Sequence, residues 1–215
     1  MITPEYELLS RLPRAAARAV RTTLPVVEES EACGETAEAY QYFRENFGRP
    51  EVPGILKCFS SSPAMLRTIM QMASILIFSE GLLGRRMKEM IATYVSSLNA
   101  CPYCLDSHGF SLKVHGGDAA VLQAVSTGNL KDASISMPER YLLEFAGNVT
   151  LQSHQVDETD IVDLRASGWE EQQIAECIHV TAMFACFNRV ANAFGLPSQD
   201  LLGLISKSSA IQTEE

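Results

Sequence analysis

The stretch EMIATYVSSLNACPYCLDSH, residues 89–108, contains most of one predicted helix and the start of the next. Apolar side chains recur three and four positions apart here and just before it, at positions 83, 87, 90, 91, 94, 95 and 98. Such spacing predicts an amphipathic helix over about residues 82–98. Glu89 lies on this helix at the end of a basic segment, RRMKE, where a carboxylate is ordinarily a solvated surface charge.

The second helix is predicted to begin at the cysteines. Asn99 can cap it, Pro102 is tolerated in its first turn, and Gly116 with Gly117 is a natural stop. Backbone N–H groups and the helix dipole favour negative charge at a helix N-terminus, which stabilises a thiolate most at Cys101.

Cys101, Cys104 and His108 are predicted to lie along one face of this second helix. Thiols three residues apart are about one helical turn from each other, and a histidine four residues further continues the face. A neighbouring imidazole can lower a thiol pKa or take its proton, and a second thiol can then close a disulfide. The helix end favours Cys101 as the reactive thiolate and the histidine spacing favours Cys104, so both stay open. The other four cysteines, at positions 33, 58, 177 and 186, are expected to be ordinary small hydrophobic residues.

The remaining sequence also predicts helices, so we expect an all-α fold. Helix starts are indicated near Ser62, Asp118, Ser136 and Asp157. A last helix over about residues 170–194 is apolar around most of its circumference, which is typical of a helix buried in a core or an interface. The sequence has no alternating strand pattern of useful length and no glycine-rich phosphate loop.

Length and composition predict a single helical domain over residues 1–215. A chain of 215 residues with 47% hydrophobic residues is long enough for one sizeable core. We expect an extended N-terminal segment over about residues 1–40 and a frayed tail over about residues 207–215.

The charge balance excludes several classes of partner. The chain has 17 Lys and Arg against 26 Asp and Glu, a formal charge of −9, so nucleic acid and anionic lipid are poor partners. No secretory signal is visible at the start, and the most apolar window, residues 65–78, is shorter than the roughly 20 apolar residues of a membrane span. We therefore expect a soluble, cytoplasmic protein without a membrane or nucleic-acid partner.

The sequence resembles a known family at these same residues. Glu89, then Cys101-x-x-Cys104 twelve residues later, then His108, is similar to the signature of the AhpD alkylhydroperoxidases within the carboxymuconolactone decarboxylase superfamily. The later segment FNRVANAFG, residues 187–195, resembles the peroxidase-related members of that group, and the resemblance covers about residues 40–200. It implies an all-helical fold with two similar helical halves, and a homo-oligomer that is commonly a trimer or hexamer, or a dimer in longer members.

The resemblance also implies a thiol-dependent hydroperoxide reductase with four catalytic residues and neither cofactor nor metal. Glu89 accepts a proton from Cys104 through His108 and a water, and the Cys104 thiolate attacks the peroxide to form a sulfenic acid. Cys101 condenses with that sulfenic acid to form a disulfide. A dithiol reductant, which in the family can be a lipoylated protein, must then reduce it.

Two other function classes stay open. The superfamily name suggests a lyase of the carboxymuconolactone decarboxylase type, but such a reaction needs no thiol pair. The thiols and His108 could instead belong to a non-enzymatic redox sensor or to a zinc-binding protein with His115 or Glu89 as the fourth ligand.

Three further polar residues lie in the predicted last helix. Asn188 and Arg189 are expected to line a cavity or to join subunits, without a catalytic role. His179 is expected to be a satisfied histidine of the core or of an interface.

Overall fold

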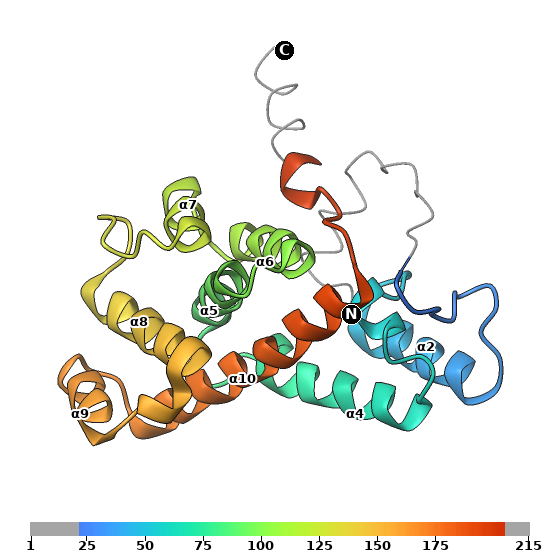
Figure 1. Cartoon of the computed structure of the whole chain (residues 1–215), viewed down its shortest axis with the longest axis horizontal. Helices are drawn as coiled ribbons and strands as arrows, with labels where there is room; N and C mark the ends of the chain where they lie inside the picture. The colour runs from blue at the N-terminus through green and yellow to red at the C-terminus, as the bar shows by residue number, and fades with distance from the viewer. Residues whose placement is uncertain (1–21, 205–215) are drawn as a thin grey trace, which may run out of the picture.

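A computed structural model describes residues 22–204, and this part of the chain is entirely helices, turns and loops (Figure 1). The elements in chain order are α2 (Gly34–Phe47), α3 (Gly54–Lys57), α4 (Pro63–Ala73), the π-helical turn η1 (Ser74–Phe78), α5 (Arg85–Leu98), α6 (Pro102–Val114), α7 (Ala119–Thr127), α8 (Met137–Gln152), the 3₁₀ turn η2 (Ser153–Gln155), α9 (Glu158–Ala166) and α10 (Glu171–Phe194). A short helical turn follows at residues 201–204. The predicted all-α fold is confirmed.

The predicted ends of the chain are described only in part. Residues 207–215, the predicted frayed tail, and residues 1–21 of the predicted N-terminal segment lie outside the described residues. Within the rest of that segment, α2 already begins at Gly34.

Most helix starts lie where the sequence predicts them, because local capping sets them. Asp118 precedes α7 and its side chain accepts a hydrogen bond from the backbone N–H of Val121 at 2.8 Å. Ser136 opens α8 in a capping box with Glu139, a pairing that satisfies two otherwise free backbone donors. α10 ends at Gly195, whose φ of 70° is left-handed.

The predicted role of Asn99 as the cap of the cysteine helix is wrong. Asn99 follows the last residue of α5, and Cys101 itself takes the N-cap position of α6. Between them Ala100 has a φ of 48°, which is rare for a residue with a side chain. The backbone N–H of Cys101 donates to the carbonyl of Ser96 at 2.9 Å, so the turn is tight and places the cysteine pair at the junction of α5 and α6.

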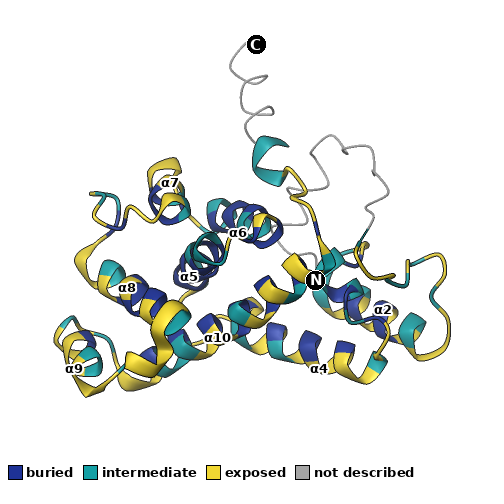
Figure 2. Ribbon diagram, in the orientation of Figure 1, coloured by how far each residue is buried: buried dark blue, intermediate teal, exposed yellow. Residues whose placement is uncertain are grey.

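Helix α5 forms the centre of the described structure and packs against α6, α7, α8 and α10. Figure 2 shows that most of α5 is buried. Its apolar face is buried as predicted, but so are the polar residues Lys88, Glu89, Thr93 and Ser96, which are 0% exposed. Helices on several sides cover what the sequence presents as a polar flank. Buried polar groups need partners, so this flank is where a site is expected.

Lys88 has its partners at the loop before α5. Its ammonium Nζ lies 2.7 Å from Oε1 of Glu176 on α10 and donates to the carbonyl of Ser79 at 3.0 Å. Gly81 passes so close that an added Cβ would lie 2.1 Å from Glu176 Oε1 and 2.4 Å from Lys88 Nζ. This buried ion pair fastens the η1–α5 loop to α10.

Helix α10 runs beside α5 and also contacts α3, η1, α6, α8 and α9 (Figure 1). It is the one helix of residues 22–204 with the length and apolar composition to cross a membrane, yet half of its most apolar 18-residue window is buried among the other helices. It also carries the buried polar residues Thr181 and Asn188. These features are those of a core helix of a globular fold.

Candidate active site

The two thiols of the Cys-x-x-Cys motif meet at the start of α6. Cys101 is 1% exposed and Cys104 is 3% exposed, and neither takes part in a disulfide. Their side chains are hydrogen-bonded to each other. Cys101 is the N-cap residue of α6 and Cys104 lies in its first turn, so the predicted placement of both thiols at a helix N-terminus is confirmed. One thiol can donate a hydrogen bond to the other.

A fully buried carboxylate orients the histidine of the same helix. Glu89 Oε2 lies 2.7 Å from Nδ1 of His108, and Glu89 is 0% exposed. Its other oxygen, Oε1, accepts from Arg85 Nε at 2.8 Å and lies 2.7 Å from a terminal nitrogen of that guanidinium. Because a carboxylate only accepts hydrogen bonds, Nδ1 of His108 carries the proton and Nε2 is left free to accept one.

This geometry corrects the interpretation of Glu89 as a solvated surface charge. A buried carboxylate requires compensation, and Arg85 and His108 provide it. Arg85 also lies over the ring of Phe78, with its guanidinium carbon 4.9 Å from the ring centroid. Arg85 was not predicted as a site residue. Its spacing is the one signal in the sequence, since Arg85 and Glu89 are four positions apart on a helix.

Asn188 on α10 lies next to the thiol pair. It is fully buried, its Nδ2 donates to Ser96 Oγ at 3.0 Å, and its Oδ1 accepts from Asn99 Nδ2 at 3.0 Å. It also hydrogen-bonds both thiols and lowers the pKa of each. The side chain is therefore locked in place by α5 while contacting the sulfur atoms.

The pKa values of the two thiols are shifted in opposite directions by their surroundings. The pKa of Cys101 lies below the usual thiol value, mainly because the Cys104 thiol donates a hydrogen bond to it. Burial opposes this effect, and backbone N–H groups at the helix start add to it. The pKa of Cys104 is raised, since it donates to Cys101 and is buried. In the resting pair, the thiolate is thus favoured on Cys101.

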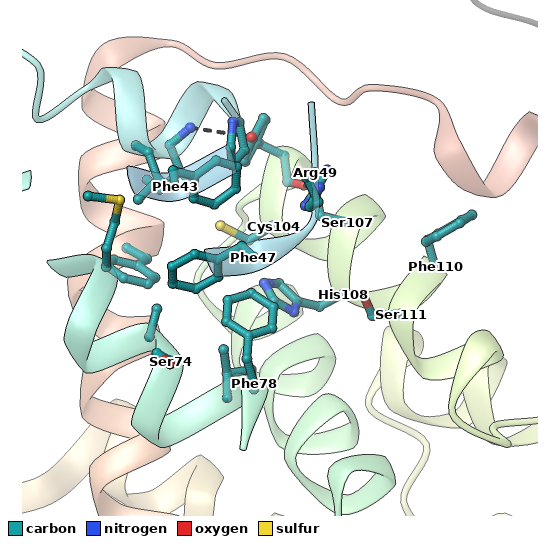
Figure 3. A pocket seen from close by; sticks show the side chains of 18 of the residues that line it. Phe43, Phe47, Arg49, Ser74, Phe78, Cys104, Ser107, His108, Phe110 and Ser111 are labelled. Atoms are coloured by element: carbon teal, nitrogen blue, oxygen red, sulfur yellow. Dashed lines mark hydrogen bonds between the residues drawn. The ribbon is translucent and has the colours of Figure 1, made fainter. Parts of the chain in front are cut away.

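The accessible thiol is nevertheless Cys104. A cavity of about 260 Å³ lies between α2, α4, η1, α6 and α10, and Cys104 and His108 both line it whereas Cys101 does not. Figure 3 shows these two residues among aromatic rings. Phenylalanines 43, 47, 78, 184 and 187 supply most of its apolar surface. A substrate held in this cavity would meet Cys104 first.

The ring of His108 is fixed by packing as well as by its hydrogen bond. Its centroid lies 4.5 Å from that of Phe184 at an interplanar angle of 85°, an edge-to-face contact. The side chain of His108 is 18% exposed. The imidazole is therefore held at the cavity wall with limited access to solvent.

Other predicted residues lie away from the thiols. His115 is at the opposite end of α6 from Cys101, about 20 Å along the helix at 1.5 Å per residue, so it cannot complete a zinc site with the thiols. Within residues 22–204, no three His, Cys, Asp or Glu side chains are placed to hold a metal ion. His179 is exposed in the single chain, so the core alternative is wrong and the interface alternative stays a prediction. Arg189 donates to the carbonyl of Ala185 at 2.7 Å and does not line the cavity.

The other cysteines differ in their surroundings. Cys58 is buried in the same cluster as Cys101 and Cys104, and burial raises its pKa to about 11. Cys177 is also buried, but Cys33 and Cys186 are exposed and do not behave as buried hydrophobic residues. The position of Cys58 beside the pair was not apparent from its place in the sequence.

Comparisons with known proteins match this fold and this site region. The sequence profile of the carboxymuconolactone decarboxylase family matches residues 63–129, a segment that contains Glu89, Cys101, Cys104 and His108. No curated protein is significantly similar to the chain in sequence.

Solved structures resemble the chain over most of its length. An uncharacterised peroxidase-related protein from Ralstonia eutropha JMP134, described as an alkylhydroperoxidase AhpD core, has 26% identity and a TM-score of 0.75, covering 86% of this chain and 96% of its own. A peroxidase-related protein from Silicibacter sp. TM1040 has 27% identity and a TM-score of 0.69, covering 83% and 94%. The debrominase Bmp8, at 16% identity and a TM-score of 0.67 over 86% and 95%, shares the fold.

The AhpD-like fold predicted from the sequence is thus confirmed, while the similarity of its two halves stays a prediction. The profile match spans the helices that carry the Glu, Cys, Cys and His residues, and the two peroxidase-related structures cover 86% and 83% of the chain. Residues 63–129 of this chain thus match the carboxymuconolactone decarboxylase family, and the chain is similar in fold to AhpD-like, peroxidase-related proteins.

Proposed function

We propose that this protein is a thiol-dependent hydroperoxide reductase in which Cys104 attacks the peroxide and Cys101 resolves the product. The observation that supports it most is the shared wall of one apolar cavity: Cys104 and His108 line it together, and Glu89 holds His108 from behind at 2.7 Å. A thiol, a base and a base-orienting carboxylate in this order form an activated nucleophile.

The first step breaks the oxygen–oxygen bond. Nε2 of His108 first takes one proton from the thiol pair, which gives the imidazolium and a Cys101 thiolate. The thiol proton of Cys104 then moves to the Cys101 thiolate along their hydrogen bond, which leaves a thiolate facing the cavity. That thiolate attacks the terminal oxygen of the hydroperoxide. The alkoxide leaves with a proton from Nε2 of the His108 imidazolium, giving an alcohol and a Cys104 sulfenic acid.

The second step closes the disulfide. His108, now neutral, takes the proton of the Cys101 thiol, and the resulting thiolate attacks the Cys104 sulfur. Hydroxide leaves and is protonated to water by the same imidazolium. Two thiols and one hydroperoxide thus yield a disulfide, an alcohol and water, with two electrons passing from sulfur to oxygen.

The buried carboxylate has an electrostatic role in both steps. Glu89 stabilises the imidazolium that forms when His108 takes a proton, and Arg85 holds the carboxylate in its orientation. A preorganised pair in a buried site acts without reorganising at the moment of reaction.

A dithiol must reset the enzyme, and the burial of the pair limits which dithiols can do so. Cys104 is only 3% exposed and lines the cavity. A dithiol on a long flexible arm, such as the lipoyl group of a lipoylated protein, fits this access better than a thiol fixed on a protein surface. We propose such a partner, together with the cytoplasmic location and self-association that the sequence predicts.

The test is thiol mass spectrometry after exposure to cumene hydroperoxide, with differential alkylation and with dihydrolipoamide as reductant in turnover assays. Wild type should lose two thiols as a Cys101–Cys104 disulfide, Cys101→Ser should stop at a sulfenic acid, and Cys104→Ser should not react. Cys33→Ser, an exposed thiol outside the cavity, is the matched control and should behave as wild type. Peroxide consumption by Cys104→Ser at the wild-type rate would refute the proposal.

A further inference from the structure

The cavity contains one cation that has no partner in the described structure. Arg49 lies in the loop between α2 and α3, is half-buried and lines the cavity with Cys104 and Ser107 (Figure 3). Among residues 22–204, no side chain or backbone carbonyl forms an ion pair or hydrogen bond with its guanidinium. Most other arginines of this part of the chain have such partners, as Arg44 has Glu29 and Arg67 has Glu38.

The rest of the lining cannot neutralise Arg49. Within the described part of the chain, no Asp or Glu lines the cavity, and its other polar lining residues, apart from Cys104 and His108, are neutral amides and hydroxyls. One of them, Ser107 Oγ, already accepts from Gln199 Nε2 at 2.9 Å and donates to the carbonyl of Tyr103 at 2.9 Å. The cavity therefore carries an uncompensated positive charge in a protein whose net charge is −9.

The charge of Arg49 also acts on the inner wall. Tyr103 is 5% exposed and lines the cavity, and its hydroxyl accepts from the backbone N–H of Ile55 at 3.3 Å. Burial raises the pKa of Tyr103, and the charge of Arg49 opposes that rise. Arg49 thus lies close enough to influence a buried cavity group.

We propose that the substrate of this cavity is a small apolar hydroperoxide that also carries a carboxylate, and that Arg49 binds this carboxylate. The inference rests on the proposed function and adds a substrate class to it. The aromatic rings take the apolar body, and the guanidinium takes the anion through charge-assisted hydrogen bonds. The volume of about 260 Å³ lies below the roughly 300–1,000 Å³ of drug-sized pockets, which favours a single-ring or short-chain acid.

The kinetic test compares cumene hydroperoxide with its para-carboxylated derivative, which has the same reacting group. Wild type should prefer the acid by about tenfold or more in kcat/KM, the equivalent of about 1.4 kcal/mol. Arg49→Gln should bring this ratio close to one, and Arg49→Lys should keep part of it because the charge stays while the fork geometry is lost. Arg67→Gln removes an exposed cation outside the cavity and should keep the wild-type ratio.

A binding measurement separates this inference from the catalytic proposal. Titration calorimetry with 4-isopropylbenzoate and with 4-isopropylbenzamide needs no turnover, and the acid should bind wild type about tenfold more tightly than the amide. Loss of that difference in Arg49→Gln supports the anion site even if no hydroperoxide is reduced. Equal binding of acid and amide to wild type, or an unchanged ratio in Arg49→Gln, overturns the inference, while turnover of neutral hydroperoxide would still support the reductase.

Discussion

Glu89 Oε2 and His108 Nδ1 lie 2.7 Å apart, although the two residues belong to different helices and are 19 positions apart in the chain. The contact exists because α5 and α6 pack side by side after a turn of only three residues, 99–101. The same turn places Cys101 at the helix start, one helical turn before Cys104. One tight connection therefore brings the carboxylate, the imidazole and both thiols together.

Glu89→Gln should reduce kcat/KM for hydroperoxide by about 100-fold or more, within the range of about 10²–10⁴ that general acid–base groups contribute. The amide can donate to Nδ1 of His108 and so favour the wrong tautomer, and it no longer stabilises the imidazolium. Steady-state kinetics with dihydrolipoamide and a pH profile of kcat/KM would measure this effect.

The control separates catalysis from folding. Glu89→Gln leaves the buried guanidinium of Arg85 without its carboxylate, and losing one member of a buried pair costs about 3–5 kcal/mol. The double variant Arg85→Met with Glu89→Gln should recover much of that stability in urea unfolding but not the activity. Recovery of both would show that Glu89 matters only for folding.

Local signals in the sequence are sufficient to predict the helices but not the contacts that form the site. The starts of α7 and α8 were predicted because Asp118 and Ser136 satisfy backbone donors a few residues away. Asn99 was assigned wrongly because its side chain bonds Asn188, a partner 89 positions away. Such pairings depend on how helices pack, which capping signals do not encode.

The same limit applies to the cavity and the buried polar groups. Glu89 reads as a surface charge in a basic segment, and only its resemblance to a family pattern identified it as a site residue. Arg49 and the phenylalanines of α2 lie more than 100 residues before the phenylalanines of α10, so no spacing rule joins the two groups. Cys58 likewise reaches the thiol cluster through tertiary packing.

Gly81→Ala should destabilise the fold by at least about 2 kcal/mol. Its φ of 58° costs an L-residue roughly 1–2 kcal/mol, and the added Cβ would displace the Lys88–Glu176 pair. Chemical denaturation of Gly84→Ala supplies the matched control, because Gly84 has a φ of −56° and nothing within 4 Å of an added Cβ. That change should cost under about 1 kcal/mol; equal losses in the two variants would contradict the assigned role of the ion pair.

The Lys88–Glu176 pair should make the folding stability decrease at acidic pH. Although burial raises it, the pKa of Glu176 is lowered overall, because Lys88 and the backbone N–H groups of Leu82 and Leu83 bind its carboxylate. A carboxyl with a depressed pKa in the folded state contributes stability above its unfolded pKa of about 4.3, and that stability is lost as pH falls through the folded value.

Urea unfolding of wild type and Glu176→Gln at pH 7 and at pH 3 tests this dependence. The difference in unfolding free energy should be large at pH 7, where the amide leaves the buried Lys88 without a carboxylate partner, and should shrink at pH 3 as Glu176 of wild type becomes protonated. Glu38→Gln, at an exposed pair with Arg67, should show little difference at either pH. A constant difference for Glu176→Gln would contradict the ion-pair explanation.

Asn188→Leu should raise the pH at which the thiol pair becomes reactive. The amide hydrogen-bonds both sulfur atoms and lowers the pKa of each, so its removal shifts thiolate formation upward and slows alkylation by iodoacetamide at pH 7. At high pH, where the thiolate forms without help, the rates of wild type and variant should converge.

Ser96→Ala removes the Ser96 hydroxyl that accepts from Asn188 Nδ2 but keeps the amide itself, so its pH profile should stay close to wild type. A rate lowered equally at every pH in Asn188→Leu would indicate restricted access to the cavity instead of a changed pKa.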